Sequence, residues 1–241
     1  MHPNILLLQA RNPGDPAKAE ERVSFAARIG CEVDKITPHD IIAEPLTLQK
    51  TLRFDALMVG GSGDYYVSKG NLPHFEATLD LLREVVERGH PTFASCFGFQ
   101  LMVEALGGEI IFDAPNVEVG TFPLALTEAG QQDELLGGLP PQFCAQLGRK
   151  DRAARLPDNS LHLASSERCP YQALRVPGKP IWATQFHPEL NREDNLGRFR
   201  RYQAGYGSVM SEAEQQATLD RFTDSPETEK LLNHFVTLVF G

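Results

Sequence analysis

One stretch sets the architecture of this chain: Pro91-Thr92-Phe93-Ala94-Ser95-Cys96-Phe97-Gly98-Phe99-Gln100. Its apolar run Thr92–Ala94 predicts a buried strand, and the following run Phe99–Leu106 has helical spacing. The thiol of Cys96 therefore lies at a sharp strand-to-helix turn, which exposes a nucleophile above a sheet and favours the thiolate at the helix N-terminus. Gly98 lets the helix begin close under the turn. Taken alone, Cys96 also fits an inert cysteine buried in a core.

A second segment favours the catalytic interpretation. The run Thr184-Gln185-Phe186-His187-Pro188-Glu189-Leu190 follows a predicted strand at Ile181–Ala183, so His187 and Glu189 lie just past a strand end. A cysteine nucleophile needs a base that takes its proton and a carboxylate that orients the base. His187 and Glu189 fit these roles, and the alternative is a solvated His-Pro turn.

A third segment is rich in glycine. Val59-Gly60-Gly61-Ser62-Gly63-Asp64 follows the apolar strand Ala56–Val59. Glycines allow backbone N–H groups to converge on a developing oxyanion. The alternative is an ordinary strand-to-helix turn.

Together, these segments resemble the class I glutamine amidotransferases. The matching residues are Gly60-Gly61, then Cys96–Gln100, then Gln185–Glu189, in the order that the family shows. The stretch Leu163–Ala173 resembles the segment before the catalytic His in proteins related to the glutaminase part of GMP synthase. The resemblance covers the chain from Ala56 to Glu189.

The resemblance implies a mechanism. The Cys96 thiolate would attack the side-chain carboxamide of glutamine and form a glutamyl thioester. His187, oriented by Glu189, would protonate the leaving ammonia and then activate water against the thioester. The expected catalytic residues are therefore Cys96, His187 and Glu189, with no cofactor and no metal.

The resemblance also implies a binding role for four neighbouring residues. The N–H groups of Gly61 and Phe97 would form the oxyanion hole. Gly60 and Gln100 match positions that help hold the substrate glutamine. For Gln100, the alternative is an ordinary polar residue in the first turns of a helix.

One residue departs from the family pattern. Where relatives usually carry a His before a charged residue and an Asp, this chain has Arg149 before Lys150 and Asp151. An Arg at this position is able to bind a carboxylate bidentately. The favoured interpretation is surface charge.

Composition narrows the function classes. The chain has 241 residues, 41% of them hydrophobic, and a net charge of −9. This charge argues against a nucleic-acid or anionic-membrane surface. The cysteines Cys31, Cys96, Cys144 and Cys169 include no CxxC pair, so we expect reduced thiols and a cytoplasmic location. No stretch has transmembrane length, and Met1–Asn4 has no basic region of a signal peptide.

The predicted fold class is α/β. Alternating strands and helices predict a doubly wound, mostly parallel sheet of the flavodoxin-like kind, flanked by helices. After Gly107 the pattern predicts a partly antiparallel half. The predicted strands are Asn4–Ala10, Glu32–Ile36, Ala56–Val59, Thr92–Ala94, Glu109–Phe112, Val117–Leu126, Gln142–Leu147, Leu161–Ala164, Gln172–Val176 and Ile181–Thr184. The principal predicted helices begin at Asp15, Leu72, Phe99, Ser211 and Ser225.

Two units are expected along the chain. Residues 1–190 form the amidotransferase domain, and residues 191–241 form a helical extension packed on it. Within the extension, Asn191–Val209 is predicted to be a solvated linker, with a partner-docking surface as the alternative.

No P-loop pattern is present, so the ammonia acceptor is expected on another protein, such as a synthetase. The alternative functions are a γ-glutamyl amide or peptide hydrolase with the same triad, and a non-enzymatic regulatory module. The sequence does not predict the oligomeric state.

Overall fold

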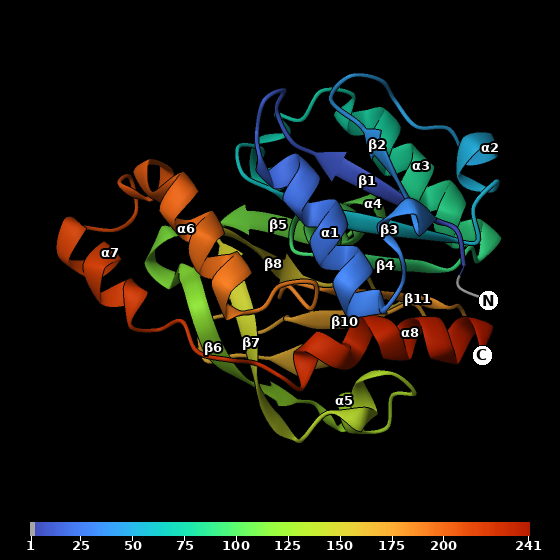
Figure 1. The fold of residues 1–241 in the computed structure, drawn as a ribbon. Coiled ribbons are helices and arrows are strands. Elements are labelled where there is room, and N and C mark those ends of the chain that lie inside the picture. The colour runs from blue at the N-terminus through green and yellow to red at the C-terminus, as the bar shows by residue number, and fades with distance from the viewer. Residues whose placement is uncertain (1–2) are drawn as a thin grey trace.

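The computed structural model describes residues 3–241 (Figure 1). Met1 and His2, the start of the segment expected not to be a signal peptide, lie outside the described residues. The first half alternates strands and helices as predicted. Its elements are β1 Ile5–Ala10, α1 Ala17–Ile29, β2 Ile36–Asp40, α2 Leu48–Thr51, β3 Ala56–Ser62, α3 Phe75–Arg88, β4 Thr92–Ser95, α4 Phe97–Ala105 and β5 Glu109–Phe112.

The second half is richer in short strands and ends in helices. Its elements are β6 Glu118–Leu126, α5 Glu128–Gln131, β7 Gln142–Arg149, β8 Asp151–Arg155, β9 Leu161–Ser165, β10 Ala173–Arg175, β11 Ile181–Thr184, α6 Arg192–Tyr206, α7 Glu212–Leu219 and α8 Leu231–Phe240. Of these, β8 is not among the predicted strands. No helix in residues 3–241 combines the length and the apolar character needed to cross a membrane.

Nine strands of the described chain form one sheet in the order β2-β1-β3-β4-β11-β10-β9-β6-β7. The first five run parallel, and β10, β9, β6 and β7 continue the sheet in antiparallel pairs. The predicted fold class, a mostly parallel sheet with a partly antiparallel second half, is confirmed. Strand β4 lies between β3 and β11, and the three strands run parallel. The three motifs therefore meet at the carboxyl ends of these central strands.

Helices cover both faces of the sheet. In Figure 1, α1 and α8 cover one face, while α3 and α4 lie behind the strands. On the α8 face, Phe235 makes edge-to-face contacts with Phe93 and Trp182, at 5.6 and 5.9 Å between ring centroids. Such contacts stabilise a core beyond simple burial. The C-terminal helix is therefore part of the central packing.

Three local predictions are wrong. The segment predicted as the strand Glu32–Ile36 forms a 3₁₀ turn at Val33–Lys35, and β2 begins only at Ile36, the first buried side chain. Val23, expected on the buried stripe of α1, is 53% exposed. Ser225 does not cap a helix, because its hydroxyl accepts a hydrogen bond from Gln146 and α8 begins later.

The largest correction concerns the expected linker, which forms the helix α6. Its start is a capping box: the Asn191 side chain accepts from the Asp194 N–H at 2.8 Å, and the Asp194 carboxylate accepts from the Asn191 N–H. This Asn-x-x-Asp signal is present in the sequence. The helix has few apolar residues, so its periodicity does not reveal it.

Candidate active site

Cys96 lies at a strained backbone turn between β4 and α4. Its φ of 53° and ψ of −102° are unusual for a residue with a side chain, and such a conformation costs on the order of 1–3 kcal/mol. Two hydrogen bonds hold the turn: the Cys96 N–H donates to the Thr184 carbonyl at 2.8 Å, and the Cys96 carbonyl accepts from the Gln100 N–H at 3.1 Å. The predicted strand–turn–helix geometry is therefore present.

Gly98 explains how the turn is packed. A Cβ atom added to Gly98 would lie 2.5 Å from the Val59 carbonyl oxygen and 2.9 Å from the Val59 Cβ. The first turn of α4 thus lies directly on β3, at a separation that only glycine permits.

His187 and Glu189 follow β11 and are hydrogen-bonded to each other. His187 Nδ1 lies 2.6 Å from Glu189 Oε1, and Glu189 is fully buried. The His187 N–H also donates to the Gln146 carbonyl at 2.9 Å, which fixes the loop against β7. Because Nδ1 faces the carboxylate, Nε2 is the ring nitrogen left for proton transfer.

Electrostatics favour a charged His187. Burial alone would lower the pKa of His187, but Cys96 and Glu189 outweigh this effect and raise that pKa to about 10. Burial alone would raise the pKa of Glu189, but His187 and, to a smaller extent, Arg198 hold it below its ordinary value. The geometry therefore favours an ionised carboxylate beside an imidazolium.

The two glycines of β3 contact Glu21 of α1. A Cβ at Gly60 would lie 2.8 Å from the Glu21 carboxylate carbon, and the Gly61 N–H donates to Glu21 Oε1 at 3.1 Å. This differs from the expectation that the Gly61 N–H faces the reacting carbonyl. The glycine run also continues β3 as strand to Ser62 rather than forming a loop.

Phe97 and Gln100 lie where the sequence predicts, on the first turns of α4. Phe97 is the first helical residue, and both residues line the same cavity as Cys96. The Gln100 amide nitrogen donates within the protein, to the Asp151 carbonyl at 3.1 Å and to Gln185 Oε1 at 3.0 Å. The side chain is thus held in a fixed orientation.

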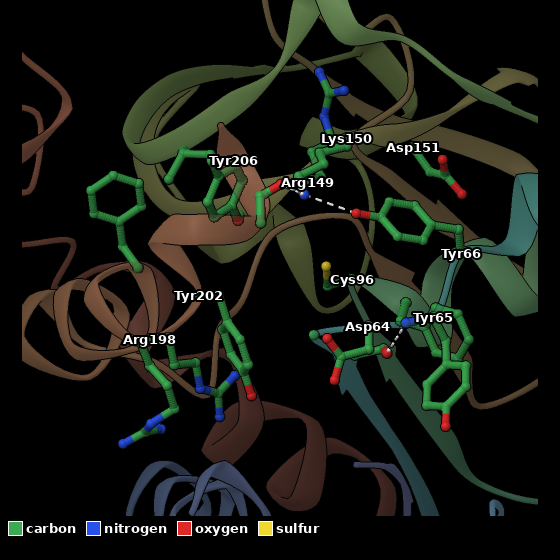
Figure 2. A pocket seen from close by; sticks show the side chains of 18 of the residues that line it. Asp64, Tyr65, Tyr66, Cys96, Arg149, Lys150, Asp151, Arg198, Tyr202 and Tyr206 are labelled. Carbon is green, nitrogen blue, oxygen red and sulfur yellow. Dashed lines mark hydrogen bonds between the residues drawn. The ribbon is translucent and has the colours of Figure 1, made fainter. Parts of the chain in front are cut away.

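Arg149 is not the surface charge that the sequence suggests. It is 2% exposed, and its Nε and Nη2 atoms donate to Glu118 Oε2 at 2.8 and 2.5 Å. In Figure 2 its side chain points away from Cys96. Arg149 therefore binds a carboxylate, but one that belongs to the protein's own interior.

The cavity above Cys96 has a volume of about 370 Å³ and two unlike walls. One wall is formed by the ends of the strands around β4. The other is formed by α6, from which Arg198, Tyr202 and Tyr206 line the space. Figure 2 shows the Cys96 sulfur between these side chains and Tyr65 and Tyr66 on the opposite side.

Hydrogen bonds join the two walls. Lys150 Nζ donates to the Tyr66 hydroxyl at 2.8 Å and to the Gly205 carbonyl at 2.6 Å. The Tyr202 hydroxyl accepts from Arg11 at 3.1 Å. The sequence singles out none of the α6 residues, because their partners lie on other elements, such as Arg11 after β1 and Lys150 after β7.

In the described part of the chain, no group of three or more His, Cys, Asp or Glu side chains is placed to hold a metal ion. The Cys96 thiol, the His187 imidazole and the Glu189 carboxylate lie together in or beside the cavity.

Similarity to known proteins identifies the family of this chain. Residues 21–198 match the family model described as glutamine amidotransferase class-I. The chain belongs to this family, so the resemblance predicted from the three motifs and the assignment to an enzyme class are confirmed.

Several curated relatives of this chain are named GMP synthase. The chain is 31% identical over 169 residues to "GMP synthase [glutamine-hydrolyzing]" of Lactobacillus delbrueckii subsp. bulgaricus, covering 70% of this chain and 30% of that protein. It is 28% identical over 158 residues to the protein of the same name from Streptococcus mutans serotype c, covering 65% and 29%. The chain thus spans about 30% of the length of these curated relatives.

Solved structures share the fold. A glutamine amidotransferase from Thermotoga maritima matches over 100% of both chains with a TM-score of 0.71 and 14% identity. A glutamine amido transferase from Methylobacillus flagellatus matches 98% of this chain and 93% of its own, with a TM-score of 0.70 and 18% identity. At these identities, the likeness concerns the fold alone.

Proposed function

We propose that this chain hydrolyses the side-chain amide of glutamine, with Cys96 as nucleophile, His187 as general base and acid, and Glu189 as the carboxylate that orients His187. The observation that carries the proposal is the strained, cavity-facing Cys96 beside the hydrogen-bonded pair His187–Glu189. This arrangement of nucleophile, base and orienting group suits acyl transfer through a covalent intermediate.

The reaction has two halves. The Cys96 thiolate adds to the carboxamide carbon, and His187 gives a proton to the departing ammonia, leaving a glutamyl thioester. The then-neutral His187 takes a proton from water, which adds to the thioester; glutamate leaves, and the Cys96 thiolate and His187 imidazolium are restored. The N–H of Phe97, at the start of α4, is suited to stabilise the oxyanion.

On the family pattern, the N–H of Gly61 also belongs to the proposed oxyanion hole. Its N–H would have to exchange Glu21 for the oxyanion during the reaction, because it now donates to that carboxylate. Gly60 and Gln100 are proposed to contact the substrate. Two protein acceptors hold the Gln100 amide nitrogen, and within residues 3–241 its side-chain carbonyl accepts no hydrogen bond and is suited to this role.

We propose further that the ammonia passes to a synthetase-type acceptor on another protein, in the cytoplasm. The relatives that suggest this role carry the synthase name over a length of which this chain spans about 30%. The division into residues 1–190 and 191–241 also remains a prediction, and α6 contributes residues to the cavity from beyond residue 190.

The test is glutamate release from glutamine by the purified protein beside its Cys96→Ala variant. Turnover by the wild type alone is expected. If the wild type is silent, reaction of Cys96 with a glutamine-like chloroketone would indicate a formed site that awaits its acceptor. Silence in both assays would contradict the proposal and favour a γ-glutamyl amide substrate or a regulatory role.

A further inference from the structure

Arg198 of α6 is buried against the carboxylate that holds His187. Its side chain is 8% exposed, and its Nη1 lies 3.7 Å from Glu189 Oε1. Neither terminal nitrogen of Arg198 finds a hydrogen-bond partner among the residues that the structure describes, and the same holds for Glu189 Oε2. Arg198 therefore acts on Glu189 through charge at short range, and the charged atoms of both side chains are shielded from solvent.

The charged groups around Glu189 come from several elements. His187 lies on its own loop, Arg198 on α6, and Cys96 lies across His187 at the start of α4. Behind Arg198, Glu21 of α1 lies 3.9 Å from its Nη2 and 3.0 Å from Arg11, which directly follows β1. We call Arg11, Glu21, Glu189 and Arg198 the ionic layer.

The ionic layer contains two cations and two anions, all buried. A lone buried carboxylate would be protonated, because burial penalises the charged form. Glu189 needs a cation that remains charged while His187 gains and loses its proton. A guanidinium meets this need, since it does not titrate in the working range of a protein.

We infer that Arg198 is a positioning residue of the active site: it keeps Glu189 ionised throughout the reaction and ties it, through Glu21, to the Gly61 strand. The inference rests on the proposed roles of Cys96, His187 and Glu189. It makes α6 part of the machinery, because this helix delivers the cation that the His187–Glu189 pair needs.

The direction of the expected effect follows from the charges. Without Arg198, the pKa of Glu189 rises, and the carboxylate is lost at a higher pH than in the wild type. A protonated Glu189 no longer holds His187 through a charged hydrogen bond, so His187 is less well placed to activate Cys96. The reactivity of Cys96 should therefore fall off earlier as the pH is lowered.

The experiment measures the rate of Cys96 alkylation by iodoacetamide against pH, with the adduct located by mass spectrometry. In Arg198→Met, the acid limb of this profile is expected to move up by about one pH unit or more, the range for losing an opposite charge at this distance. Arg198→Lys should return part of the shift. Arg200→Met, which changes an exposed arginine of the same helix, is the matched control and should leave the profile unchanged.

A double variant distinguishes the loss of the Arg198 charge from a general effect on folding. Glu21→Gln combined with Arg198→Met removes one charge of each sign from the ionic layer and still leaves Glu189 without its cation. The upward shift should persist in this double variant. If either the single or the double variant is folded and its Cys96 alkylation rate has the wild-type pH dependence, the inference is wrong. Because alkylation needs no glutamine, this outcome is independent of whether glutamine proves to be the substrate.

Discussion

The two walls of the cavity are built in different ways. The sheet wall, at the ends of β3, β4 and β11, holds its functional groups through backbone hydrogen bonds and glycine contacts with the neighbouring strands. The helix wall, α6, brings in long side chains that reach buried partners on α1, just after β1 and in the loop after β11. Short sequence motifs therefore identify the functional groups of the first wall, whereas the second wall depends on which side chains α6 packs against.

The largest effect is expected on the sheet wall. His187→Gln removes the group that moves the proton, so glutamate release should fall by about 10²–10⁴-fold while the fold is retained. His234→Gln, at an exposed position of α8, is the control and should keep full activity. Near-normal turnover by the His187 variant would show that the base lies elsewhere.

A buried ion pair between β6 and β7 comes next. Arg149→Met leaves Glu118 buried without its cation, so the free energy of unfolding should fall by about 3–5 kcal/mol. Adding Glu118→Met should recover much of this loss, because both charges are then removed. Chemical denaturation of the two variants measures both values, and a loss that the double variant fails to reduce would contradict a paired role.

A Gly→Ala substitution should change the stability of the protein in opposite directions at Gly98, on the sheet wall, and at Gly197, in α6. Gly98→Ala places a methyl group 2.5 Å from the Val59 carbonyl and should destabilise the protein by about 1–3 kcal/mol. Gly197→Ala, in α6, meets nothing within 4 Å and should stabilise it by about 0.4–1 kcal/mol. Thermal unfolding of both variants tests the contrast, and equal signs would show that the helix wall is packed as tightly as the sheet wall.

The smallest effect is expected from a single hydroxyl of the helix wall. Tyr202→Phe removes the group that accepts from Arg11 and donates to Asp15, which should lower the free energy of unfolding by about 0.5–1.5 kcal/mol. Tyr171→Phe is a suitable control, because its hydroxyl makes no hydrogen bond within residues 3–241. Denaturant titration measures both, and a larger loss would make Tyr202 central to the attachment of α6.

The same contrast explains which features the sequence predicts. The strand, turn and helix around Cys96 follow from an apolar run, a glycine and helical spacing, all present within a few residues. His187 and Glu189 are predictable because they share one short motif. Arg198 and Glu21 are not, since their roles arise from a layer of charges assembled from α1, α6 and the end of β1.

Errors in the sequence interpretation have the same origin. The interpretation of Arg149 as surface charge is wrong because its partner, Glu118, lies on the adjacent strand β6 and leaves no trace near residue 149. The motif likewise gives no sign of the hydrogen bond from the Gly61 N–H to Glu21, because this contact depends on the packing of α1 on β3. Only tertiary structure reveals such partners.

The ionic layer has a consequence for how this sequence is able to change. Because two cations and two anions balance in a buried space, replacing any one of them leaves an uncompensated charge, whereas replacing Arg11 together with Glu21 leaves Arg198 beside Glu189. Viable substitutions at positions 11 and 21 should therefore arise together, while position 198 keeps its cation. As related sequences diverge, the residues at positions 11 and 21 are expected to change together.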